Sequence, residues 1–172
     1  MPKRRIYGSK EQHHFINGNY VFLAFCFVLY QILSSVFSLP ILIGFFFCYM
    51  FILLKERDFT LYDLDFRWYF SLGYLLFIDI THDFYLFSSW IAFFIFYYFC
   101  SDWIKINFKI GKMLAVFFTL CAYLLLYILN SVLSYVDDSK LNIFGIEYLI
   151  YALIESAFCF LFFKDKLRWE CV

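Results

Sequence analysis

The sequence predicts an all-α protein, a polytopic transmembrane bundle of six helices with both termini in the cytoplasm. Hydrophobic residues make up 65% of its 172 residues, and the mean hydropathy is +0.76, whereas only about half of a soluble domain is apolar. Polar or proline-containing positions interrupt its long apolar runs. With those interruptions taken as turns, thirteen of the 14 Lys and Arg residues fall on one side of a membrane. This distribution is expected because cytoplasmic loops retain positive charge.

The first apolar run covers residues 20–54 and is too long for one membrane span. As a single helix it would be about 50 Å long, against a hydrocarbon core of about 30 Å. Pro40, which three serines precede, cannot supply a helical N–H and disfavours helix in the residue before it. We therefore predict one helix over about 20–37 and a second over about 40–54.

The second apolar run, residues 68–99, is interrupted by a polar segment at 79–83. We predict helices over 68–80 and 84–99. Because the first of these would be only about 20 Å long, its following turn should lie below the outer membrane surface, or the bilayer should thin locally.

Two further helices are predicted over about 113–136 and 143–163, with an external polar turn at 137–142. The chain then has three parts: a cytoplasmic tail over 1–19, a six-helix transmembrane domain over 20–163, and a second cytoplasmic tail over 164–172.

The basic residues form four clusters on the predicted cytoplasmic side. They run from Lys3 to Lys10, from Lys55 to Arg67, from Lys105 to Lys112 and from Lys164 to Arg168, and Lys140 alone lies opposite. The formal net charge is zero, and no basic stripe crosses a predicted face. We therefore expect the lipid bilayer as a partner and no nucleic acid.

No motif in the sequence indicates catalysis. It contains no Gly-rich phosphate loop, no G-x-S-x-G and no H-E-x-x-H. Its six cysteines show no C-x-x-C spacing, which argues against a metal site. We expect no catalytic residue, no cofactor and no metal, and predict that the protein is not an enzyme.

Glu155 is the deepest ionisable side chain, close to the predicted membrane midplane, and such residues are functional candidates. Glu147 and Tyr151 share its helix face at i, i+4 spacing. We expect this face to point into the bundle, where Asn130 or Gln31 would supply a hydrogen bond. Two interpretations remain open: a role in helix packing, and a role in binding a ligand or a proton.

Asp79, His82 and Asp83 lie close together at the second interruption. A carboxylate and an imidazole can share a cation or a proton, so a lipid-modifying enzyme that uses Asp79 and His82 is one interpretation. However, Asp83 opens the predicted helix 84–99, where a carboxylate caps free N–H groups. We predict capping for Asp83, and a structural or contact role for Asp79.

Three segments of the sequence form a recognisable pattern: Gln31-Ile32, Leu39-Pro40 and the stretch from Phe70 to Asp79, in which Gly73 and Asp79 lie six residues apart. With six predicted spans, this pattern resembles MreD, the rod shape-determining membrane protein family, in which a Gly and an Asp follow in the same order. The resemblance covers most of residues 20–163 and is firmest over 70–99.

The resemblance implies a non-enzymatic scaffold of the cell-elongation machinery in the bacterial inner membrane, which helps to control cell shape and lateral peptidoglycan synthesis. It also implies an MreC-like partner and, through it, MreB, RodA and penicillin-binding proteins. The candidate structural or partner-contact residues are Gly73, Asp79, Asp83, Asn130, Glu147, Tyr151 and Glu155.

An alternative function is the substrate-binding subunit of a membrane transporter for a vitamin-like molecule. Small six-helix proteins serve in this way, and the face formed by Glu147, Tyr151 and Glu155 would line the pocket for a polar or cationic ligand.

Overall fold

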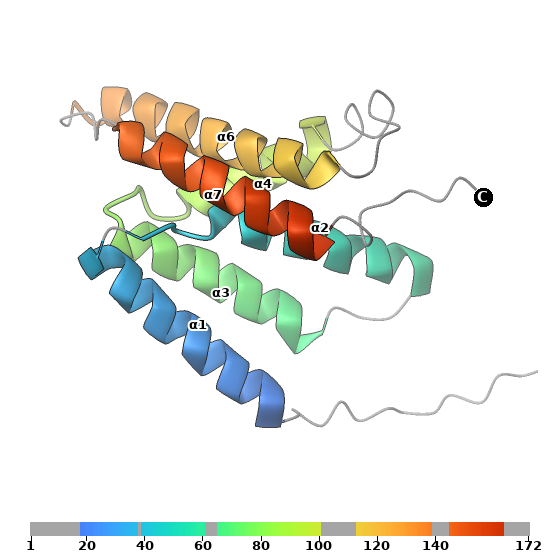
Figure 1. Ribbon diagram of the computed structural model, residues 1–172. Helices are drawn as coiled ribbons and strands as arrows, with labels where there is room; N and C mark the ends of the chain where they lie inside the picture. Colours follow the sequence, from blue (N-terminus) through green and yellow to red (C-terminus); the bar gives the residue numbers. More distant parts are fainter. Residues whose placement is uncertain (1–17, 38, 61–64, 101–112, 139–144, 164–172) are drawn as a thin grey trace, which may run out of the picture.

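The computed structural model describes residues 18–37, 39–60, 65–100, 113–138 and 145–163, and within these ranges it is helical with no strand (Figure 1). The prediction of an all-α fold is confirmed. The elements are α1 (Gly18–Phe37), α2 (Ile43–Thr60), α3 (Phe66–Thr81), α4 (Ser88–Ile95), which continues as the π-helix η1 (Phe96–Cys100), α6 (Leu114–Val136) and α7 (Ile146–Phe163).

Each predicted helix has a counterpart, but three of them begin three or four residues later than predicted. α2 begins at Ile43 instead of residue 40, α4 at Ser88 instead of residue 84, and α7 at Ile146 instead of residue 143. Before α2 and before α4, a stretch of non-helical backbone follows the preceding helix. The C-terminal tail, most of the N-terminal tail and the basic loop at 101–112 lie outside the described residues.

α2 is the central helix of the fold, in contact with α3, α6 and α7. Its first three turns are apolar on every side, a pattern that predicts a buried helix. The ring of Phe46 stacks on Tyr74 of α3 with centroids 4.0 Å apart, and the ring of Phe51 meets Phe118 of α6 edge to face at 4.7 Å. The buried side chains of α2 are Ile43, Phe46, Phe47, Cys48, Met50, Phe51, Ile52, Leu53 and Leu54.

The outer helices expose apolar side chains. α6 and α7 are long and apolar enough to cross a membrane. In the most apolar 18-residue stretch of each helix, only 33% (α6) and 28% (α7) is buried. A core helix of a soluble protein would instead be mostly buried. The apolar parts of α1 and α4 are shorter, at Val21–Phe37 and Ser88–Phe99. Soluble monomers rarely expose apolar patches of more than a few hundred Å², so this exterior is typical of a protein surrounded by lipid.

The start of α1 and the end of α7 lie at the same end of the bundle (Figure 1). α2 and η1 end there, and α3 and α6 begin there. All the Lys and Arg residues within the described ranges, Lys55, Arg57 and Arg67, belong to the segments at this end. We call it the basic end.

Candidate functional site

Glu155, on the inner face of α7, is fully buried at the start of α2. Its Oε2 accepts a hydrogen bond from the backbone N–H of Gly44, with 2.8 Å between the nitrogen and the oxygen. Its Oε1 accepts hydrogen bonds from the backbone N–H of Leu42 and from the hydroxyl of Tyr123, the latter at 2.5 Å. Both carboxylate oxygens are therefore used within the protein.

This carboxylate caps α2. The first N–H groups of a helix have no partner within the helix, and the positive end of its dipole favours an anion. Leu42 has a left-handed backbone with φ of 67°, and α2 begins at the next residue. Glu155 lies about 12 Å along the helix axis from the end of α7 at Phe163, so α2 begins near mid-height of the bundle.

Side chains of α1 satisfy carbonyl groups in the non-helical segment before α2. The hydroxyl of Tyr30 donates to the carbonyl of Pro40 at 2.7 Å, and the hydroxyl of Ser34 donates to the carbonyl of Leu39 at 2.8 Å. Buried backbone polar groups need such partners. The break predicted from Pro40 is thus a structured segment held by side chains of α1 and α7.

Gly44 allows α2 and α6 to approach closely. A Cβ atom built on it would lie 2.3 Å from Cγ2 of Thr119 and 3.0 Å from Oε2 of Glu155. Sequence reasoning missed both Gly44 and Tyr123. A glycine inside an otherwise bulky apolar run is the one signal that could have indicated this contact, because small residues mark close helix packing in membranes.

Asp79 is also fully buried, at the end of α3. Its Oδ2 accepts hydrogen bonds from the hydroxyl of Ser89 at 2.9 Å and from the backbone N–H of Ser89 at 3.3 Å, and its Oδ1 accepts from the hydroxyl of Ser88 at 3.3 Å. The structure thus gives Asp79 a structural role, as a cap of α4.

Asp83 does not cap α4, and the prediction that it would do so is wrong. α4 begins at Ser88, and its N-cap position is Phe87, with no side-chain cap from that residue. Asp83 is exposed and has a left-handed backbone with φ of 55°. The turn covers residues 82–87 and is longer than predicted. The N–H of Ser89, in the first turn of α4, therefore meets Asp79 and not Asp83.

The starts of α2 and α4 share one geometry. In each, a residue with φ of 67°, Leu42 or Phe87, immediately precedes the first helical residue. In each, the N–H of the second helical residue, Gly44 or Ser89, donates to a buried carboxylate from another helix. No repeat in the sequence indicates this correspondence.

Asn130 does not contact Glu155, contrary to the prediction. Its Oδ1 accepts a hydrogen bond from the backbone N–H of Tyr85 at 3.0 Å, and its Nδ2 donates to the carbonyl of Leu126 at 2.9 Å and to the hydroxyl of Ser88 at 3.4 Å. It therefore fastens the turn between α3 and α4 to α6. Asn130 lies six residues before the end of α6. The turn is therefore about 9 Å from that end along the α6 axis, towards the middle of the bundle.

Gln31, the other predicted partner of Glu155, connects α1 to α3 instead. Its Nε2 donates to Oγ1 of Thr81 at 3.0 Å, and its Oε1 accepts from the hydroxyl of Tyr74 at 2.9 Å. The expected polar contact within the bundle is present, but between other helices.

The face of α7 that carries Glu147, Tyr151 and Glu155 does not form a uniform wall. Glu147 is exposed, Tyr151 is half-buried and Glu155 is fully buried. None of the three lines the cavity described below. The three side chains therefore do not share the wall of that cavity, and they differ in exposure along the helix.

Asp79 and His82 do not act as a pair. The carboxylate of Asp79 faces Ser88 and Ser89, whereas Nε2 of His82 is buried without a hydrogen-bond partner in the part of the chain that the structure describes. Among the described residues, no group of three or more His, Cys, Asp or Glu side chains is placed to hold a metal ion.

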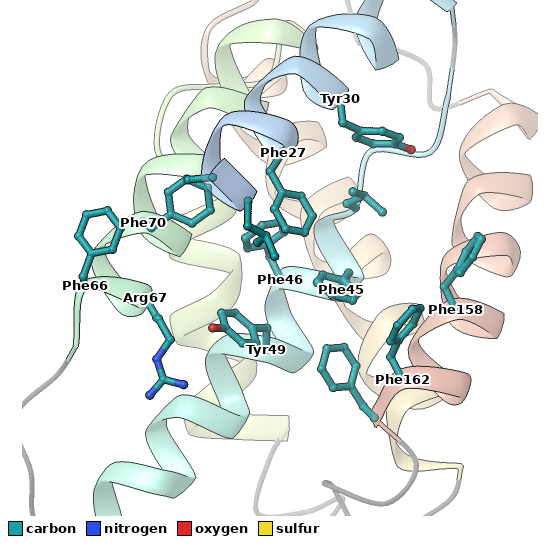
Figure 2. Close-up of a pocket in the computed structure, with 14 residues that line it drawn as sticks. Phe27, Tyr30, Phe45, Phe46, Tyr49, Phe66, Arg67, Phe70, Phe158 and Phe162 are labelled. Atoms are coloured by element: carbon teal, nitrogen blue, oxygen red, sulfur yellow. The ribbon is translucent and has the colours of Figure 1, made fainter. Parts of the chain in front are cut away.

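A cavity of about 600 Å³ lies between α1, α2, α3 and α7. Figure 2 shows Phe27 of α1 and Phe158 of α7 on opposite sides, with Phe45 of α2 between them. We call this cavity the aromatic groove; sequence reasoning did not predict it. Its lining residues are Leu23, Ala24, Phe27, Tyr30, Leu42, Phe45, Phe46, Tyr49, Phe66, Arg67, Phe70, Phe158, Phe162 and Phe163.

The comparisons with known proteins add no family to this description: no family model, no curated protein and no solved structure matches the chain.

Proposed function

We propose that the chain is a multi-pass protein of the bacterial inner membrane, which crosses the bilayer six times with both termini in the cytoplasm. The apolar exterior of the outer helices supports this topology, as does the gathering of Lys55, Arg57 and Arg67 at one end of the bundle. The basic end is the cytoplasmic end under this proposal, because loops rich in Lys and Arg are retained there.

The start of α2 also supports a membrane location. Non-helical backbone is tolerated at membrane depth only where protein buries it and satisfies its polar groups. The segment from Leu39 to Leu42 meets this requirement through Tyr30, Ser34 and Glu155. Half-helices whose N-termini lie near the midplane occur in membrane proteins and attract anionic groups, and here Glu155 is that group.

Within the membrane, we propose a non-enzymatic scaffold of the cell-elongation machinery, which helps to control cell shape and lateral peptidoglycan synthesis. The observation that carries this proposal is that the two carboxylates buried in the described part of the chain, Glu155 and Asp79, each cap a helix. Both side chains thus have a structural role. The resemblance to MreD supplies the identity of the machinery, with an MreC-like protein as the direct partner and MreB, RodA and penicillin-binding proteins beyond it.

The outward face of α3 is the proposed partner contact. Phe66, Tyr69, Gly73 and Ile80 are exposed along it. A Cβ atom at Gly73 would meet nothing within 4 Å, so the fold itself does not require glycine there. A glycine on an exposed face would instead let the helix of another protein approach closely.

Co-purification tests this proposal. The full chain, extracted in mild detergent from cells, should co-purify with an MreC-like protein, and Gly73→Leu should reduce that recovery while the chain itself remains folded. The matched control is Ala157→Leu, which makes a similar increase in size at an exposed position of α7. Failure of the unmodified chain to recover any MreC-like protein would refute the partner assignment.

Depletion of the protein in rod-shaped host cells provides the cellular readout. If the chain supports elongation, the cells should become round as lateral wall synthesis fails. Cells that keep their rod shape after the protein has disappeared would contradict the scaffold role.

A further inference from the structure

The size of the aromatic groove limits what it can hold. Its volume is about 600 Å³. The volume falls within the range of about 300–1,000 Å³ in which small ligands bind, so it suits a slender apolar occupant such as a single hydrocarbon chain.

The groove covers about one leaflet of the proposed bilayer. It begins at Leu42, at the level of Glu155 near mid-height of the bundle, and it ends at Phe163, at the basic end. These levels are about 12 Å apart along α7, close to half of a hydrocarbon core of about 30 Å. An acyl chain of the cytoplasmic leaflet would run alongside it.

At the basic end of the groove, one positive side chain of the lining lies next to two carboxylates. Arg67 lines the groove, and Figure 2 shows it at the opposite end from Tyr30. Its Nη2 lies 2.8 Å from Oδ2 of Asp65 and 3.6 Å from Oε2 of Glu56. A guanidinium carries five N–H donors and suits a phosphate, while the two carboxylates suit an ammonium group. This arrangement complements a zwitterionic headgroup.

We propose that the aromatic groove binds one acyl chain of a zwitterionic phospholipid from the cytoplasmic leaflet. The phosphate lies at Arg67 and the ammonium group lies toward Asp65 and Glu56, while Phe27, Phe45 and Phe158 enclose the chain. Bound lipid would fill the space between α1 and α7. This inference rests on the proposed membrane orientation and not on the scaffold role.

Native mass spectrometry tests the inference. The full chain is purified from bilayers that contain phosphatidylethanolamine and phosphatidylglycerol in equal amounts. We expect one retained phosphatidylethanolamine per chain. Ala24→Trp, which places an indole in the groove, should abolish this retention, whereas Val21→Trp, at an exposed position of α1 outside the lining, should preserve it.

Photo-crosslinking of the unmodified chain keeps the inference testable even if Ala24→Trp fails to fold. Phosphatidylethanolamine with a diazirine on its acyl chain should modify peptides that contain Phe70 and Phe158 more strongly than those that contain the exposed Leu124 of α6. Equal modification of all three would overturn the proposal, as would preferred retention of phosphatidylglycerol or a co-purified polypeptide that crosslinks to the groove.

The scaffold proposal can be judged separately. Lipid retention is measured on the purified chain without elongation partners, and co-purification is measured with Ala24 intact. Loss of lipid binding with an unchanged MreC-like partner would reject only the groove assignment. Retained lipid without any partner would reject only the scaffold assignment.

Discussion

Oε2 of Glu155 lies 2.8 Å from the backbone nitrogen of Gly44, although 111 residues separate them in the sequence. This hydrogen bond joins the middle of α7 to the first turn of α2. Tyr123 of α6 donates to the same carboxylate at 2.5 Å. One side chain therefore fixes three helices at the point where the central helix begins.

We predict that Glu155→Gln destabilises the fold. A glutamine offers only one acceptor oxygen. Its NH₂ group would take the place of the other carboxylate oxygen and face a donor group, so that donor would lose its hydrogen bond. The expected loss is roughly 1–3 kcal/mol, the cost of leaving a buried donor unsatisfied. Thermal unfolding in detergent, followed by circular dichroism, would measure it.

Glu147→Gln is the matched control, because Glu147 is an exposed residue two turns earlier on the same helix. It should leave the unfolding temperature unchanged. Equal stability of Glu155→Gln and the unmodified chain would show that the carboxylate is not needed as a cap.

Gly44→Ala should also destabilise the protein, through steric overlap. The added methyl group would lie 2.3 Å from Cγ2 of Thr119, so α2 and α6 would have to separate. Overpacking of this kind typically costs about 1–3 kcal/mol. Thr119→Ser removes Cγ2 and should restore part of the stability in the double variant, as measured by thermal unfolding.

The control for this prediction is Gly73→Ala. Nothing lies within 4 Å of the added Cβ, and alanine stabilises a helix interior by roughly 0.5–1 kcal/mol relative to glycine. A similar loss for Gly44→Ala and Gly73→Ala would contradict the close contact between α2 and α6.

The two aspartates near the turn from 82 to 87 should respond differently to the same substitution. Asp79→Asn leaves one acceptor oxygen for three donor groups of Ser88 and Ser89, so we expect a loss of roughly 0.5–2 kcal/mol, as for a helix cap. Asp83→Asn should have little effect, because Asp83 is exposed and asparagine tolerates its left-handed backbone. Chemical denaturation of both variants would compare them, and a larger loss for Asp83→Asn would refute the capping assignment.

Cysteine labelling should establish the orientation of the bundle. In a chain whose native cysteines are replaced by serine, Asp138→Cys should react with an impermeant maleimide added to intact spheroplasts. Arg57→Cys, at the basic end, should react only after the membrane is opened. The reverse pattern would place the basic end outside and exclude the proposed topology.

The sequence by itself determined that the chain is helical, where its apolar runs break and that Glu155 is buried. These features are local, because composition and the positions of Pro40 and the polar residues at 79–83 set them without reference to other helices. The sequence could not indicate that α2 begins at Ile43 or α4 at Ser88.

Only the tertiary structure decided which groups meet the two buried carboxylates. Glu155 was expected to bond the side chain of Asn130 or Gln31, but its partners include the backbone N–H groups of Leu42 and Gly44. Every residue except proline carries an N–H, so no sequence signal marks the few that lack a helical partner until the helix starts are known. The aromatic groove likewise depends on how α1, α2, α3 and α7 pack, which no single helix encodes.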